Sequence, residues 1–102
     1  MPHACSYVVP ADEEIYRQVN REMGNDGSLH PDGLVVHLAV QCDAGLRHYQ
    51  VWETKAAWER FRDGTVLPAV GRVLKAAGFD TLPPPPVEEE LQVVGVDLGR
   101  PA

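Results

Sequence analysis

The feature that most constrains the fold is a strand-then-helix unit between Leu46 and Ala77, which reads LRHYQVWETKAAWERFRDGTVLPAVGRVLKAA. Its first part alternates and is rich in Tyr, Val and Trp, which predicts a strand over residues 46–53. Thr54 then stands where a helix N-cap belongs, and Trp58 and Phe61 follow at helical spacing. The other segments of the chain can be placed against this unit.

The helix of this unit is predicted to be discontinuous. Gly64 and Thr65 interrupt its pattern, and Pro68 can restart it, because a proline in the first turn loses no donor that the helix needs. We therefore expect helix over residues 54–77 with a break around Gly64 to Pro68.

Three further strands and one more helix are predicted in the rest of the chain. The helix is amphipathic, with apolar residues at four-residue spacing, and Gly24 to Gly33 follows it as a loop. The short CDAG connection predicts an antiparallel hairpin between the second and third strands. The strands are expected over 3–9, 33–41 and 88–98, and the helix over 11–23.

The resulting order is β-α-β-β-α-β, which predicts an α+β, ferredoxin-like domain over residues 1–102: a four-stranded antiparallel sheet with both helices on one face. The proline run Pro83–Pro86 is expected to be an extended connector. The acidic run Glu88 to Glu90 is expected to be a solvated entrance to the last strand, and residues 99–102 a fraying tail.

Composition excludes several kinds of partner. The formal charge is −6 and no basic cluster occurs, which argues against nucleic acid and anionic membranes. No apolar run has the length of a membrane span, and the first residues have no secretory-signal pattern. Cys5 and Cys42 are not in a CxxC pair, and we expect two free thiols in a cytoplasmic protein rather than a disulfide.

Alternation along the two hairpin strands divides their side chains between two sheet faces. If the turn pairs Gln41 with Leu46, then Ala39 lies opposite His48, His37 opposite Gln50, and Val35 opposite Trp52. The other face is almost entirely apolar and contains Leu34, Val36, Leu38, Val40, Tyr49 and Val51. Two helices cover only one face, so we expect a second copy of the chain to cover the apolar one in a two-fold homodimer.

The element order, the GLVVHLAV strand and above all the VWETKAAWERF junction resemble the dimeric α/β-barrel superfamily, in particular small proteins related to the antibiotic-biosynthesis monooxygenases. The resemblance covers nearly the whole chain. It implies a homodimer in which two sheets pack face to face and each subunit keeps a pocket between sheet and helices. In that arrangement the residues on the pocket side are Val35, His37, Ala39, His48, Gln50 and Trp52.

The chain departs from the haem-degrading members of that superfamily. Their pattern has an asparagine in strand one, a tryptophan in the second helix and a haem-ligating histidine about ten residues later. Here strand one has no asparagine, Phe61 replaces the tryptophan, and Gly71 stands where the histidine should be. Haem degradation is therefore disfavoured.

His37 is the candidate acid–base residue, because a buried histidine beside a hydrogen-bonding partner such as Gln50 can hold a proton. The alternative is a neutral core histidine that is merely satisfied by its neighbours. His37 and His48 together provide too few ligands for zinc, so we expect no metal and no cofactor.

The remaining pocket candidates are aromatic side chains that stack on a planar substrate or simply pack the core: Trp52, Trp58, Phe61 and Tyr16. Two functions stay open. One is a cofactor-independent monooxygenase-like or isomerase-like enzyme for a planar hydrophobic compound, phenolic or quinone-like. The other is a non-catalytic dimeric ligand-binding or structural protein of the same fold.

Overall fold

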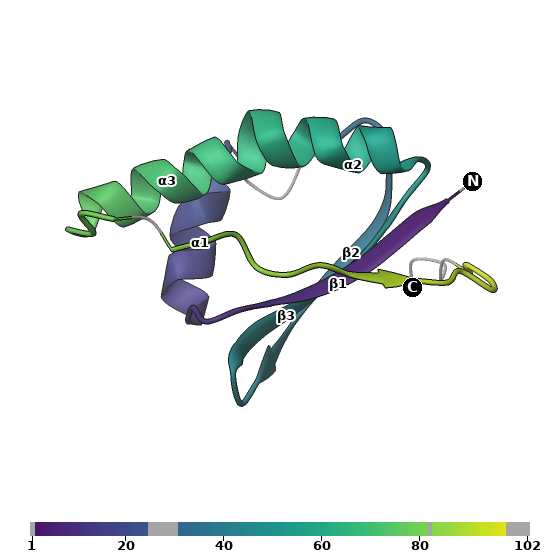
Figure 1. Ribbon diagram of the computed structural model, residues 1–102, viewed down its shortest axis with the longest axis horizontal. Coiled ribbons are helices and arrows are strands. Elements are labelled where there is room, and N and C mark those ends of the chain that lie inside the picture. Colours follow the sequence, from purple (N-terminus) through teal and green to yellow (C-terminus); the bar gives the residue numbers. More distant parts are fainter. Residues whose placement is uncertain (1, 25–30, 82, 98–102) are drawn as a thin grey trace, which may run out of the picture.

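The computed structural model describes residues 2–24, 31–81 and 83–97. Helices pack on one side of a sheet, as Figure 1 shows. In chain order the elements are β1 (His3–Val9), α1 (Glu13–Glu22), β2 (Leu34–Cys42), β3 (Gly45–Trp52), α2 (Lys55–Phe61), the π-helical turn η1 (Arg62–Val66), α3 (Leu67–Ala76) and β4 (Glu89–Leu91).

The four strands form one antiparallel sheet in the order β2-β3-β1-β4. The predicted α+β class and the predicted hairpin between β2 and β3 are confirmed, and the arrangement is compatible with a ferredoxin-like fold. β1 and β3 occupy the middle of the sheet, so their side chains provide most of the surface that the helices cover. β2 and β4 are edge strands.

The last strand is much shorter than expected. Of the predicted 88–98, only Glu89–Leu91 pairs with β1, opposite Ser6, Cys5 and Ala4. Beyond that register β1 offers only His3 and then Pro2, which has no backbone N–H to donate. Residues 92–97 therefore continue without regular secondary structure, and Leu98 lies outside the described residues, as do 25–30 of the predicted loop and the predicted tail 99–102.

The predicted break in the second helix is a π-helical turn that interrupts the α-helix at Arg62–Val66, with Pro68 in the first turn of α3, and the chain does not leave the helix there. α2, η1 and α3 form one continuous helical rod (Figure 1), and the backbone N–H of Leu67 donates to the carbonyl of Arg62, five residues back. Pro68 has no N–H and its ring would crowd the Gly64 carbonyl in a regular α-helix. A π turn just before the proline widens the helix, so that the missing N–H and the bulk of the proline ring are tolerated and the helix continues.

The N-termini of α1 and α2 are capped by side chains. Thr54, predicted as an N-cap, accepts a hydrogen bond from the backbone N–H of Ala57 at 3.1 Å. Asp12 accepts one from the N–H of Ile15 at 2.9 Å. These caps fix where α2 leaves β3 and where α1 leaves β1, and so place both helices against the same face of the sheet.

The hairpin register agrees with the prediction from the turn back to His37, and differs at the first residues of β2. Gln41 lies opposite Leu46, Ala39 opposite His48, and His37 opposite Gln50. A bulge between Leu34 and Val36 then puts Leu34, not Val35, opposite Trp52. Leu34 consequently packs against the helix-side core and does not belong to the outer face where we expected it.

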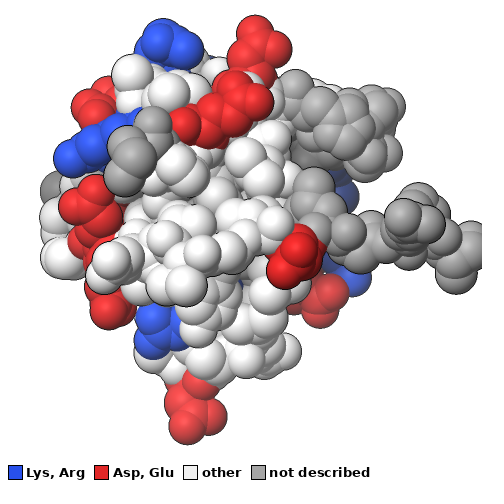
Figure 2. Space-filling model, turned by 90° about the vertical axis from the view of Figure 1, so that its right-hand side faces the viewer, with Lys and Arg blue, Asp and Glu red and all other residues white. Residues whose placement is uncertain are grey.

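Arginine side chains on the surface are largely paired with carboxylates. Ion pairs join Arg17 to Glu13, Arg21 to Glu14, and Arg72 to Glu22. On the face shown in Figure 2 the basic groups are separated by acidic and uncharged areas and form no basic patch. None of the described helices is long and apolar enough to cross a lipid bilayer.

Gly33 gives a test of how tightly β2 is held to α2. Its φ is +89°, and a Cβ added there would lie 2.7 Å from the Cβ of Ala57. Gly24 has a similar φ of +78° with nothing within 4 Å of such a Cβ, so it is a matched control. We expect Gly24→Ala to cost about 1 kcal/mol in urea unfolding, and Gly33→Ala about 2–4 kcal/mol because a clash is added. Equal losses would show that the two elements are not packed this closely.

Candidate functional site

The helix-facing side of the two central strands carries the candidate residues. In β3 every second side chain is buried, and the set is Leu46, His48, Gln50 and Trp52. Tyr7 and Cys5 of β1 join them, because Tyr7 lies opposite His48 and Cys5 opposite Gln50. The predicted grouping of His48, Gln50 and Trp52 on one face is therefore observed, and it faces α1 and α2.

His37 and His48 form a hydrogen-bonded pair. The Nε2 of His37 lies 2.9 Å from the Nδ1 of His48, and the rings are nearly parallel at 14°. His48 is buried, whereas His37 is exposed. Our expectation that His37 is buried was wrong, because β2 is an edge strand and leaves one side of the ring open.

Both imidazoles are driven toward their neutral forms. Burial, and next the proximity of His37, lower the pKa of His48 from 6.5 to about 4. Partial desolvation of the ring lowers the pKa of His37. A neutral pair joined by one hydrogen bond has one ring donating and the other accepting. At neutral pH the pair can therefore take up a proton rather than release one.

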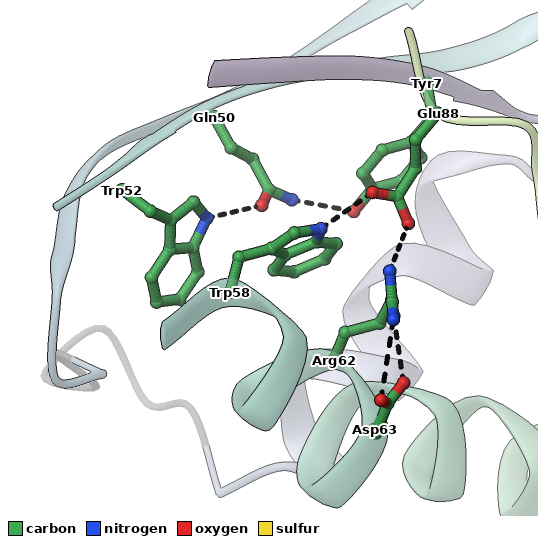
Figure 3. Close-up of polar contacts among 7 residues, drawn as sticks. All are labelled: Tyr7, Gln50, Trp52, Trp58, Arg62, Asp63 and Glu88. Carbon is green, nitrogen blue, oxygen red and sulfur yellow. Dashed lines mark hydrogen bonds and ion pairs between the residues drawn. The ribbon is translucent and has the colours of Figure 1, made fainter. Parts of the chain in front are cut away.

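Gln50 does not hold His37, although the two residues are opposite each other. Its Nε2 donates to the hydroxyl of Tyr7 at 2.8 Å, and its Oε1 accepts from the indole N–H of Trp52 at 2.8 Å. Figure 3 shows this side chain bridging the two aromatic residues. The predicted role of Gln50 as the partner that orients His37 is wrong, and His48 holds that position instead.

Aromatic rings connect the histidine pair to the core. Tyr7 stacks on His48 with centroids 4.8 Å apart and on Trp58 at 6.1 Å, and Tyr16 of α1 tilts against His48 at 5.7 Å. Burial raises the pKa of the Tyr7 hydroxyl above its usual range, and the charges of nearby Cys5 and Glu88 raise it further. Tyr7 is thus a neutral donor and acceptor, and sequence reasoning missed it.

A second polar group lies beside Trp58. The Oε1 of Glu88 accepts from the indole N–H of Trp58 at 2.8 Å, and its Oε2 accepts from Arg62 at 2.9 Å (Figure 3). Arg62 also pairs with Asp63 at 2.9 Å and lies over the Trp58 ring. Glu88 is therefore a half-buried anchor and not part of a solvated entrance, as its sequence context had suggested.

The residues expected to line a pocket pack on one another. Trp52 contacts Trp58 and Phe61 at centroid distances of 5.5 and 5.6 Å, and Leu34 and Val66 fill the space around them. Two surface hollows lie elsewhere. One, of about 430 Å³, is between α1 and α3, and one of about 330 Å³ is beside the β2–β3 turn. Neither touches His37, His48, Trp52 or Trp58.

The buried His48 ring predicts a loss of stability in acid. Its folded pKa is below its unfolded value, so the folded state binds fewer protons and stability falls as pH drops from about 6.5 toward 4. The shift corresponds to at most about 3 kcal/mol. Urea unfolding at about pH 7 and about pH 4.5 measures the loss.

His48→Gln is the matched variant for this experiment, because it removes the titrating ring and leaves every carboxylate in place. We expect its unfolding free energy to depend on pH less steeply than that of the unsubstituted chain. Identical pH dependence in the two proteins would show that the His48 ring does not cause the loss of stability in acid.

Comparisons with protein-family models and with curated proteins found no match to this sequence. The resemblance to the dimeric α/β barrels therefore stays a prediction from the GLVVHLAV and VWETKAAWERF segments.

Proposed function

We propose that this chain is a homodimeric small-molecule protein in which His37, backed by His48, takes a proton from a planar hydrophobic compound of phenolic or quinone-like type. Proton removal is the first step that an isomerase-like and a cofactor-independent oxygenase-like reaction would share. The observation that carries the proposal is the 2.9 Å contact between an exposed and a buried imidazole.

Such a pair has the properties of a general base. When the Nε2–H of His37 donates to the Nδ1 of His48, the Nδ1 of His37 carries the free lone pair. After His37 gains a proton, the same hydrogen bond supports its positive charge. The lowered pKa of His37 keeps it in the basic form at neutral pH.

The surroundings of the pair favour a flat apolar substrate. The open side of His37 lies at the β2 edge of the sheet, and Tyr16 and Tyr7 both lie against the ring of its partner His48. A planar compound that approaches His37 along this edge would contact its exposed imidazole, behind which the aromatic rings lie. We propose this edge, rather than the packed sheet–helix interior, as its place of binding.

The outer face of the sheet supports the homodimer. Val36, Leu38 and Tyr49 are 38%, 54% and 41% exposed on the side opposite the helices. An antiparallel sheet that faces water usually carries polar residues there. A second copy placed face to face would cover these side chains. Because each is already about half-buried, covering the rest is worth about 1 kcal/mol per side chain before association costs.

A non-catalytic protein of the same fold is the second candidate. The close packing of Trp52, Trp58 and Phe61 favours it, because these rings fill the space that a ligand inside the fold would need. Activity that depends on His37 separates the two candidates.

The dimer is tested by sedimentation velocity at micromolar concentration. We expect about twice the chain mass of 11.2 kDa. Leu38→Asp should shift the protein toward monomer, since it puts an unpaired carboxylate into the covered face. Val87→Asp is the control, because Val87 is 90% exposed and outside the sheet. A monomeric unsubstituted chain, or an unchanged Leu38→Asp mass, would contradict the proposal.

Base catalysis is tested with 5-nitrobenzisoxazole, a planar apolar compound. A base removes its carbon-bound proton, the N–O bond breaks, and a coloured cyanophenolate forms. We expect a rate above that of free imidazole at the same concentration, with an apparent pKa below about 6.5. His37→Gln should lower the rate by about tenfold or more, within the range that general bases contribute.

Near-ultraviolet circular dichroism and sedimentation are the controls that check whether His37→Gln keeps the fold and the dimer. A folded His37→Gln variant as active as the unsubstituted chain would remove the general-base role and leave the non-catalytic candidate.

A further inference from the structure

Three metal-ligating side chains converge on the β1–β4 side of the sheet. His3 and Cys5 are two residues apart on β1, so they point to the same face, and Glu88 comes just before β4. One ligand atom from each lies within 4.8 Å of the other two. His3 and Cys5 are buried and Glu88 is half-buried.

One ring nitrogen of His3 has no hydrogen-bond partner among the described residues. The ring of His3 is only 7% exposed, and its Nε2 has no hydrogen-bond partner among the described residues. The other ring nitrogen, Nδ1, lies 3.5 Å from a carboxylate oxygen of Glu90. A buried polar atom without a partner costs free energy, so a native structure normally supplies one.

We propose that His3, Cys5 and Glu88 bind one zinc ion, with the unpartnered Nε2 of His3 as the nitrogen ligand. A mixed set of imidazole nitrogen, thiolate sulfur and carboxylate oxygen is typical of zinc, and it is too soft for Mg²⁺ or Ca²⁺. Three protein ligands leave the fourth tetrahedral position to a water molecule.

The residues around the cluster form the outer shell that such a site needs. A carboxylate oxygen of Glu90 lies 3.5 Å from the Nδ1 of His3, on the side where carboxylates orient zinc-binding histidines. Trp58 and Arg62 donate to the two oxygens of Glu88, and each oxygen keeps a lone pair for a metal. The carboxylates of Glu88 and Glu90 outweigh the Arg62 cation that pairs with Glu88, so the local charge favours a divalent ion.

The geometry needs only a modest contraction. Ligand atoms around a tetrahedral zinc at 2.0–2.3 Å are roughly 3.3–3.6 Å apart, so the cluster closes by at most about 1.5 Å through side-chain rotation. On binding, the Cys5 thiol becomes a thiolate, its S–H bond is exchanged for an S–Zn bond, and the proton leaves to the solvent. No oxidant or reductant takes part.

This site is separate from the proposed proton-transfer pair. His37 lies on β2, at one edge of the sheet, and the cluster lies between β1 and β4 at the other. Neither proposal requires the other, so failure of one leaves the other standing.

The test uses the 102-residue chain after treatment with a chelator. Zn²⁺ is titrated by calorimetry, and Co²⁺ is used as a spectroscopic substitute because a thiolate ligand gives it a charge-transfer band in the near ultraviolet. We expect one Zn²⁺ per chain, a rise in melting temperature, and the cobalt–thiolate band, with no response to Mg²⁺.

Cys5→Ser and Cys42→Ser are the matched variants, since the chain has these two cysteines and both are free. Cys5→Ser should abolish the band and weaken Zn²⁺ binding about 100-fold or more, whereas Cys42→Ser should bind as the unsubstituted chain does. His3→Gln should weaken zinc binding similarly while keeping the circular dichroism spectrum of the metal-free protein.

Three results would overturn the proposal. They are the absence of Zn²⁺ binding to the unsubstituted chain, a cobalt–thiolate band that survives in Cys5→Ser, and binding that is lost in His37→Gln but kept in a folded His3→Gln variant.

Discussion

The packing of Trp52 against Trp58 joins the sheet to the helices, and the other features of the interior depend on it. Trp52 ends β3 and Trp58 lies in the first turns of α2, so the contact at 5.5 Å fixes the angle at which the chain turns from strand to helix. The N-cap of Thr54 and the positive φ of Gly33 also stabilise this β3–α2 corner, the turn between Trp52 and Trp58. Both indole N–H groups are satisfied, one by Gln50 and the other by Glu88.

This corner separates two polar regions on the helix-facing side of the sheet. On the β2 side, His37 and His48 share a hydrogen bond and are driven toward the neutral state. On the β4 side, Cys5 lies near Glu88 and Glu90, and burial together with these carboxylates raises its pKa to about 11, so the metal-free thiol is neutral. Two groups of ionisable residues thus lie on either side of an aromatic core, each with different chemistry.

Much of the fold could be predicted because it depends on local sequence patterns. The alternation of β3, the amphipathic repeat of α1 and the Thr54 cap predicted those elements and the antiparallel hairpin. The bulge at Leu34 could not be predicted, because either of two neighbouring apolar residues satisfies the pattern. The continuous helix through Pro68 depends on a π turn that no single residue signals. The length of β4 depends on where β1 begins.

The candidate site was predicted less well, since it depends on contacts between distant segments. Alternation placed His48, Gln50 and Trp52 together, but the partner of His37 was wrong because rotamers decide whether Gln50 reaches Tyr7 or His37. Glu88 and Cys5 come from opposite ends of the chain, and only the β1–β4 register brings them together. No spacing rule in the sequence contains that information.

The central claim is that His37 and His48 act as one neutral, proton-accepting pair. Nitrogen-15 NMR of the imidazole rings, followed through a pH titration, tests it most directly because the shifts report which nitrogen carries a proton. The account predicts that at neutral pH one of the facing nitrogens, Nε2 of His37 or Nδ1 of His48, is protonated and the other is not, and that His48 stays neutral well below about pH 6.5. Independent titration of both rings near their ordinary pKa, with neither facing nitrogen hydrogen-bonded, would contradict it.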